Sequence, residues 1–128
     1  MSEESKIVTA CLQLLEVEFN LGNVKWFGRL QSGDAMVKKS YKSVKTGKLT
    51  EYMSRMRGCK KGTADLFYIN DCDVQCWVEV KTSKGKLNPD QNKFKKIIKE
   101  IVEGHVFLVV RSAFELTQHI HHKGGLDA

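Results

Sequence analysis

The sequence contains no apolar run long enough to cross a bilayer. A membrane-spanning helix needs about 20 consecutive apolar residues, so we predict no transmembrane segment. The polar, acidic start at residues 1–5 lacks the basic residues that open a secretory signal, and we therefore expect an intracellular protein. Internal repeats and linker-like stretches are also missing from the 128 residues. A chain of this length suits one core, so we predict a single domain over residues 1–128.

Cysteines are few, and no pair of them has a partner pair at the spacing of zinc ligands. Cys72 and Cys76 are four residues apart, which a zinc site can use, but ordinary strand or turn residues are the favoured interpretation. The histidines near the chain end, His119, His121 and His122, are interpreted in the same way as a polar terminus. In a reducing compartment thiols stay reduced by default, so we predict no disulfide.

Acidic residues are scarce in one segment, residues 38–61, which we call the basic insert. It contains nine Lys or Arg and one acid, Glu51, so it carries a charge of +8 in a chain whose total is +6. A local excess of this kind suits a phosphate-binding surface, because each neutralised phosphate releases condensed counterions. Taken alone, a solvated flexible loop explains the run equally well.

Apolar periodicity and turn residues predict the order of the elements. In chain order they are a helix over 4–19, a strand over 24–30, the basic insert, strands over 64–69 and 74–82, a helix from 88–91 to Gly104, a strand over 105–110 and a short helix opened by 112–115. The insert is predicted to hold either a hairpin around Thr46–Gly47 or a mobile arm. A strand, a helix and an apolar strand between residues 74 and 110 fit a parallel crossover. We therefore predict an α/β fold with helices flanking a mixed sheet, in the order α-β-(basic insert)-β-β-α-β-α.

Charged residues occur inside one of the apolar strands. In Glu79-Val80-Lys81, strand alternation sends Glu79 and Lys81 to one face and Val80 to the other. Charges on such a strand are costly unless they are paired, hydrated or bound to metal. Asp65 begins the preceding strand of the same hairpin, so its carboxylate can approach that of Glu79. None of these charged side chains is expected to lie in the apolar core.

Two converging carboxylates repel each other, and a divalent cation relieves the repulsion. Oxygen ligands suit Mg²⁺ or Mn²⁺, and such an ion assists phosphodiester hydrolysis. A neighbouring lysine stabilises the developing charge. The alternative for these residues is a surface ion pair between Glu79 and Lys81 on an edge strand, with Asp65 in a turn.

Three stretches in succession, Gly62–Asp65, Val78–Thr82 and Lys84–Gln91, resemble the VRR-NUC family of the PD-(D/E)XK nuclease superfamily. The resemblance extends to Val109–Ser112 and covers essentially the whole chain. Lone domains of this size resemble phage-encoded junction resolvases. The resemblance therefore implies a restriction-endonuclease-like core and a metal-dependent nuclease that cuts branched DNA, such as four-way junctions. One departure is Ala64, where the superfamily name specifies proline, a position that contributes backbone shape more than chemistry.

The resemblance also implies roles for single residues. Asp65 and Glu79 match the metal-binding carboxylates, the Val80 carbonyl matches a third ligand, and Lys81 matches the catalytic lysine. Gln91 matches a glutamine that supports the site, although a capping box with Asn88 explains it equally well. Glu4 matches an acid on the first helix that is a further metal ligand, although stabilisation of the helix dipole is the stronger interpretation. The candidate DNA contacts are Arg29, Ser32, Lys38, Lys39, Lys42, Lys45, Lys84 and Lys86.

The favoured hypothesis is an endonuclease that depends on Mg²⁺ or Mn²⁺ and acts on branched DNA as a homodimer. A dimer is expected because a four-way junction takes two symmetric incisions, and a C2 dimer supplies two identical sites. A flap-cutting, nicking or less selective nuclease would use the same residues. A nucleic-acid-binding module without turnover is the alternative from a different class.

Overall fold

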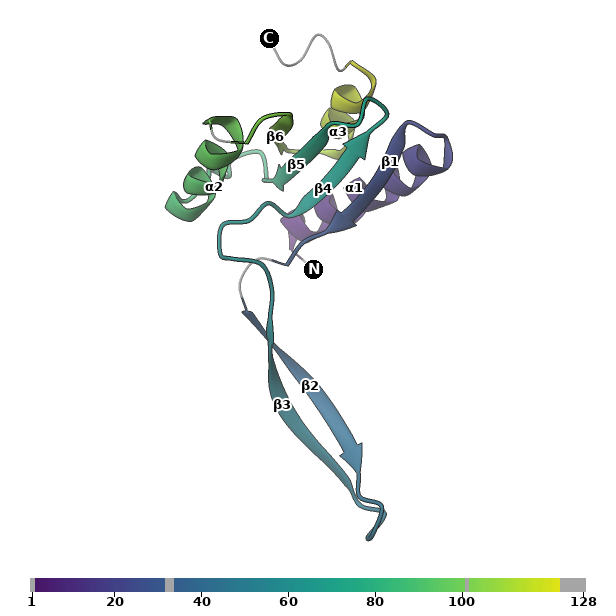
Figure 1. The fold of residues 1–128 in the computed structure, drawn as a ribbon. Helices are drawn as coiled ribbons and strands as arrows, with labels where there is room; N and C mark the ends of the chain where they lie inside the picture. The colour runs from purple at the N-terminus through teal and green to yellow at the C-terminus, as the bar shows by residue number, and fades with distance from the viewer. Residues whose placement is uncertain (1, 32–33, 101, 123–128) are drawn as a thin grey trace.

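The computed structural model describes residues 2–31, 34–100 and 102–122, with the backbone alone at residues 34–37 and 54–57. Ser32, one of the candidate DNA contacts, lies outside the described residues. The elements are, in chain order, α1 (Glu3–Asn20), β1 (Val24–Arg29), β2 (Asp34–Lys42), β3 (Leu49–Arg57), β4 (Leu66–Asn70), β5 (Gln75–Val80), α2 (Pro89–Glu100), β6 (His105–Val110) and α3 (Ala113–His121). The predicted order is confirmed, and the basic insert supplies most of β2 and all of β3 (Figure 1).

The fold is α/β, with a mixed four-stranded sheet in the order β1-β4-β5-β6. Strand β4 pairs antiparallel with β1 and β5, whereas β6 runs parallel to β5. Parallel neighbours need a crossover connection, and α2 provides it here, so the predicted crossover is confirmed. Within the described ranges, no helix is long and apolar enough to span a bilayer.

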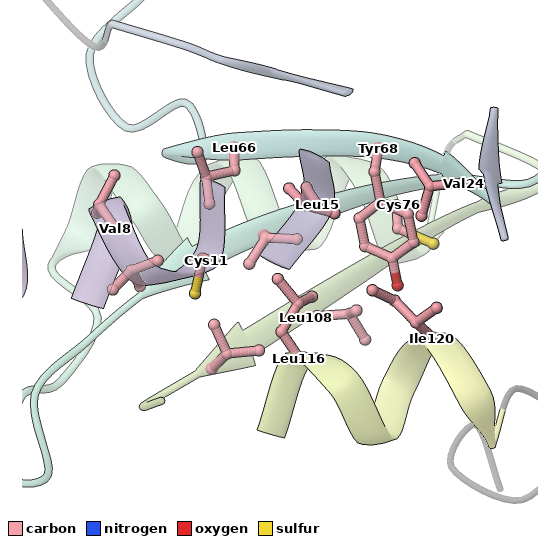
Figure 2. Packing of buried hydrophobic residues seen from close by; sticks show 13 residues of the cluster. Val8, Cys11, Leu15, Val24, Leu66, Tyr68, Cys76, Leu108, Leu116 and Ile120 are labelled. Atoms are coloured by element: carbon pink, nitrogen blue, oxygen red, sulfur yellow. The ribbon is translucent and has the colours of Figure 1, made fainter. Parts of the chain in front are cut away.

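One face of the sheet forms an aliphatic core with α1 and α3 (Figure 2). Alternate residues of β4 and β5, such as Leu66 and Val78, point to this face and are fully buried, as strand geometry requires. Helix α1 contributes Cys11 and Leu15, which lie four residues apart on one side of the helix. This layer fixes the positions of the central strands, and the next residue along each strand is thereby directed to the opposite face.

Aromatic rings cover that opposite face beneath α2. The ring of Phe94 on α2 lies with its centroid 5.4 Å from Trp77 on β5 and 6.0 Å from Phe107 on β6. Glu79 and Lys81 follow Trp77 at intervals of two residues, so they point to the same face. The helix thus shields the end of β5 at which the charged residues lie.

Helix α2 ends at Glu100, whereas the sequence predicted an end at Gly104. The N–H of Val102 donates to the carbonyl of Ile97 at 3.2 Å, a bond that closes the last turn before the glycine is reached. Gly104 has φ +77° and lies in the turn that leads into β6. The glycine therefore serves the turn that follows the helix.

The chain between β1 and β4 forms a separate two-stranded antiparallel hairpin, which we call the arm (residues 34–57). Its register runs from Asp34 opposite Arg57 to Lys42 opposite Leu49. In the connecting turn, Gly47 has φ +70°, a conformation that side chains with a Cβ rarely adopt. The hairpin predicted around Thr46–Gly47 is confirmed, and it projects away from the body of the protein (Figure 1).

Candidate active site

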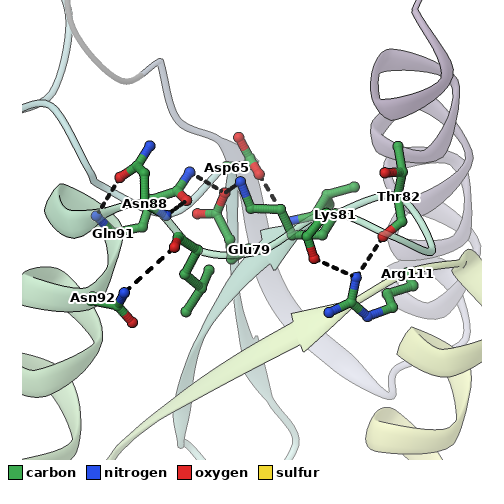
Figure 3. A network of polar contacts seen from close by, with 11 residues as sticks. Asp65, Glu79, Lys81, Thr82, Asn88, Gln91, Asn92 and Arg111 are labelled. Carbon is green, nitrogen blue, oxygen red and sulfur yellow. Dashed lines mark hydrogen bonds and ion pairs between the residues drawn. The ribbon is translucent and has the colours of Figure 1, made fainter.

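The two carboxylates predicted to converge lie across the β4–β5 hairpin. Asp65 is the residue before β4, and the β4–β5 register, continued by one pair, places it opposite Glu79. Asp65 Oδ2 accepts a hydrogen bond from the backbone N–H of Val80 at 2.8 Å, which holds the carboxylate at the end of the hairpin. Figure 3 shows the two carboxylates together with the Lys81 side chain.

Glu79 and Lys81 form a buried ion pair. Their exposed fractions are only 1% and 9%, and Lys81 Nζ lies 3.8 Å from Glu79 Oε1. The alternative of a surface ion pair is therefore wrong. Neither side chain belongs to the aliphatic cluster, as expected, but both are buried on the opposite face of the sheet. A buried pair adds little stability, because desolvation offsets the attraction.

Gln91 has both of the roles that the sequence left open. Its Oε1 accepts from the backbone N–H of Asn88, and the Asn88 Oδ1 accepts from the backbone N–H of Gln91, each at 2.9 Å. These two bonds form the capping box of α2. The other end of the same amide, Nε2, donates to Glu79 Oε1 at 2.9 Å (Figure 3). The helix cap therefore also holds a carboxylate of the site.

The second oxygen of Glu79 is buried and has no partner. Oε2 receives no hydrogen bond, which is rare for a buried polar atom. Burial, the charge of the neighbouring Asp65 carboxylate and a hydrogen bond that protonated Glu79 makes with Asp65 raise the pKa of Glu79 to about 8. The Lys81 ammonium opposes this shift, and Glu4 adds a smaller upward contribution. The carboxyl groups of Glu79 and Asp65 are therefore not both charged at neutral pH unless a further cation lies beside them.

Glu4 and Arg29 lie beside these carboxylates. A cleft of about 470 Å³ opens between the start of α1, the end of β1 and the start of β4, and it is lined by Ser2, Glu3, Glu4, Ser5, Val8, Arg29, Asp65 and Thr82. The predicted neighbourhood of Glu4 and Asp65 is therefore present, while a ligand role for Glu4 stays a prediction. Thr82 was not singled out from the sequence, although it directly follows Lys81.

Arg111 is a second residue that the sequence analysis missed. Its Nη1 donates to the carbonyls of Thr82 and Gly85 at 2.5 and 2.8 Å (Figure 3). These bonds tie the end of β6 to the loop that follows Lys81. Gly85 packs there closely, since a Cβ at this position would lie 3.3 Å from Lys81 Cδ. The only signal in the sequence was an arginine at a strand end.

The oxygen atoms of the site suit a hard divalent cation. Within the described residues, no three His, Cys, Asp or Glu side chains group as a metal site, so the side-chain donors here are the carboxylates of Asp65 and Glu79. In a strand, the N–H and C=O of one residue point to the same side, and the Val80 carbonyl is therefore directed toward Asp65. Mg²⁺ binds through one or two carboxylates and keeps several waters. The donor set and the unpartnered Glu79 Oε2 both fit such an ion.

The cysteines and histidines that were considered as zinc ligands do not come together as a zinc site in the part of the chain that the structure describes. Cys72 is exposed whereas Cys76 is buried, and no disulfide joins the four cysteines, all of which the structure describes. His121 Nε2 instead lies 3.0 Å from Glu18 Oε1 and connects the ends of α3 and α1. The prediction of four reduced cysteines agrees with this arrangement.

No family model, curated protein or solved structure matches this chain. The geometry of the site and the motifs of the sequence are therefore the basis for its function, and the family resemblance stays a hypothesis.

The candidate DNA-binding lysines occupy two places. Lys84 and Lys86 are exposed on the loop after β5, next to the carboxylates in the chain. The four candidate lysines in the insert are exposed along β2 and the turn of the arm, namely Lys38, Lys39, Lys42 and Lys45. Lys38 Nζ lies 2.9 Å from Glu51 Oε2, so its charge is already paired. The structure thus separates an arm set of lysines from a loop set.

Proposed function

We propose that the protein is a metal-dependent DNA endonuclease that hydrolyses phosphodiester bonds, a VRR-NUC nuclease with a restriction-endonuclease-like core. The observation that carries the proposal is the state of Glu79. One of its buried oxygens is held by Gln91, and the other has no partner while a second carboxylate lies beside it. Such an arrangement costs stability, and a bound cation removes the cost.

Each side chain of the site has a role in this proposal. Asp65, Glu79 and the Val80 carbonyl would hold Mg²⁺ or Mn²⁺, and that ion supplies positive charge at the phosphodiester and lowers the pKa of water. Lys81 places an ammonium beside the carboxylates, where it stabilises charge that develops on the phosphate. Gln91 fixes the carboxylate of Glu79 through one oxygen and leaves the other available.

We infer that branched DNA, with four-way junctions foremost, is the substrate and that the protein acts as a homodimer. The family resemblance and the basic arm support DNA as the substrate. Two symmetric incisions need two copies of the site, which a C2 dimer provides. Comparing cleavage of linear, flap, fork and four-way DNA tests this selectivity, and equal rates on all four would identify a less selective nuclease.

Cleavage should require Mg²⁺ or Mn²⁺ and be poorly supported by Ca²⁺, because Ca²⁺ adopts looser coordination with more ligands. The measurement is cleavage of labelled DNA by protein treated with EDTA, before and after each ion is restored. Full activity in EDTA would contradict the proposed site. Binding of DNA without cleavage under any ion would instead identify a binding module without turnover.

Replacing Lys38, Lys39, Lys42 and Lys45 together with Gln should weaken DNA binding and flatten its dependence on salt. Each lost phosphate contact removes about 0.9 from the slope of log K against log salt concentration. Because Lys38 is paired with Glu51, we expect the other three lysines to account for most of the change. Single-turnover cleavage at saturating protein should fall much less. A slope equal to that of the parent protein would mean that the arm lysines do not contact phosphates.

A further inference from the structure

The arm is the largest feature of the chain that the proposed active site does not use. Its nine-residue strands pair only with each other and form a sheet of their own. Figure 1 shows it standing clear of the helices and strands that the structure describes. A lone two-stranded hairpin is at best marginally stable in water. The arm is therefore expected to gain stability from a contact with another molecule.

Large apolar side chains are exposed along the arm. Those that the structure describes are Tyr41, Val44, Leu49, Tyr52 and Met53. Val44, in the turn, is 101% exposed. Two backbone hydrogen bonds close the turn. The N–H of Ser43 donates to the Lys48 carbonyl at 2.9 Å, and the N–H of Gly47 donates to the Ser43 carbonyl at 2.8 Å. An exposed apolar surface of this kind marks a contact site.

One face of the arm presents two tyrosines. In the β2–β3 register, Tyr41 is opposite Thr50 and Tyr52 is opposite Lys39. Cross-strand partners share a face and diagonal neighbours lie within reach of aromatic side chains. The two rings accordingly meet edge to face, with centroids 6.1 Å apart and planes at 62°. Lys39 lies on the same face, so the aromatic pair is adjacent to a cation.

The other face repeats the combination of apolar and basic residues. Lys42 is opposite Leu49, and Lys38 is opposite Met53. Including Lys45 and Lys48 in the turn, the residues from 38 to 53 carry five lysines and one acid. An apolar surface interleaved with cations suits a polyanion that also offers apolar faces. A second copy of the chain suits it less, because its own arm carries the same positive charge.

We propose that the arm binds unpaired or unstacked bases of the DNA, a proposal that rests on the proposed function. Tyr41 and Tyr52 contact base faces, Val44 is an apolar wedge at the tip, and the lysines contact phosphates. Intact duplex presents only base edges in its grooves, whereas branch points and single strands expose base faces that stack on aromatic side chains. Apolar side chains inserted between bases are a known means of unstacking them.

The position of the arm connects this binding surface to the candidate active site. The arm leaves the body after β1 and returns through residues 58–64, directly before Asp65. Gly62 in this return has φ +98°, and a Cβ there would lie 2.5 Å from the Asp90 carbonyl, so the segment packs tightly against the start of α2. The base of the arm therefore joins the body beside the carboxylates, and its tyrosines lie toward the far end.

The test compares binding of junction and duplex DNA by a protein that does not cut. The parent is the Glu79→Gln protein in EDTA, and the DNAs are a blunt duplex and a four-way junction with 2-aminopurine at the branch point. Changing Tyr41 and Tyr52 together to Leu keeps apolar side chains but removes the rings. We expect junction affinity to fall about 10-fold or more, because the stacking of bases on the two aromatic rings is lost. Duplex affinity should stay within about twofold, and the 2-aminopurine quenching should be lost.

Two control variants test whether the arm remains folded and whether the loss of any exposed aromatic side chain weakens DNA binding. Changing both tyrosines to Phe keeps the rings and should leave junction binding and quenching intact, whereas an unfolded arm would weaken duplex and junction binding alike. Phe114→Ala removes a 70% exposed aromatic residue on α3 and should have no effect. Equal losses on duplex and junction, or no loss at all, would overturn the proposal. If sedimentation shows that the Leu variant differs from its parent only in oligomeric state, the arm binds a second copy of the chain and the proposal is overturned.

Failure of this proposal and failure of the proposed function give different results. A protein that cuts no DNA, but whose junction binding depends on the tyrosines, would remove the nuclease assignment and keep the base-binding arm. A metal-dependent nuclease whose Leu variant binds junctions normally would remove the arm proposal and keep the assignment.

Discussion

Glu79→Gln should abolish cleavage and, above about pH 8, should also stabilise the metal-free protein. The change removes a charged metal ligand, so we expect activity to fall below detection. It also replaces a buried carboxylate that repels Asp65 with a neutral amide of the same size, whose N–H₂ can donate to that neighbour. The unfavourable burial of Oε2 is thereby relieved.

The gain in stability should depend on pH in a defined direction. Because the pKa of Glu79 is raised to about 8 in the folded protein, the folded state retains a proton between about pH 4.5 and 8 that the unfolded state has released. Stability of the wild-type protein therefore decreases as pH rises through this window, and the deficit is complete above it. The Gln variant has no such loss.

Thermal unfolding in EDTA at pH 5 and pH 9 measures this difference. We expect Glu79→Gln to unfold at least about 4 °C above wild type at pH 9, which is on the order of 1 kcal/mol for a domain of this size. At pH 5 the two should be nearly equal. Added Ca²⁺ should raise the midpoint of wild type more than that of the variant, because a ligand stabilises the state that binds it. A variant less stable than wild type at pH 9 would show that Glu79 is satisfied without a cation.

Replacing Lys81 with Met should lower the cleavage rate by about 10² or more and leave DNA binding nearly unchanged. The ammonium acts as charge develops on the phosphate, so its loss affects the transition state more than the ground state. Methionine is preferable to alanine, because Lys81 is 9% exposed and its stem packs against Gly85. A single lysine is also a small part of the basic surface that binds DNA.

Single-turnover cleavage in Mg²⁺ and equilibrium binding in Ca²⁺ separate the two effects. Lys96→Met, on the exposed side of α2, is the matched control and should cleave at the wild-type rate. Thermal unfolding of the Lys81 variant should remain cooperative. If Lys81→Met cuts normally, the buried ion pair has a structural role and the active-site assignment fails.

The order of the elements was predictable because each carries its own apolar period, as in the continuous apolar strand β6. The arm was harder to predict, since the side chains that the structure describes on it, residues 38–53, are largely exposed on both faces and show no apolar alternation. A hairpin around Thr46–Gly47 and a mobile arm were therefore equally compatible with the sequence of the insert. The end of α2 was predicted at Gly104, beyond its position at Glu100. Gly104 has the positive φ that is common after a helix, but here it lies in the turn that leads into β6.

The pairing of Asp65 with Glu79 followed from the hairpin register, which is a local property of the chain. Burial of Glu79 and Lys81 did not follow, because it depends on where α2 lies over the sheet. The bonds from Arg111 to the Thr82 and Gly85 carbonyls join residues 29 and 26 positions apart. Spacing along the chain carries no signal for a contact of that kind.

The side-chain amide of Gln91 caps α2 through its oxygen and holds the Glu79 carboxylate through its nitrogen. Opening of the first turn of α2 therefore also frees the Glu79 carboxylate. Fraying of a helix end is ordinarily a local motion with little free-energy cost. Here fraying would also break the hydrogen bond that Gln91 Nε2 donates to Glu79 Oε1. An ion bound at the carboxylates should therefore slow the opening of α2, and amide exchange in the first turn of the helix should report metal binding without any DNA.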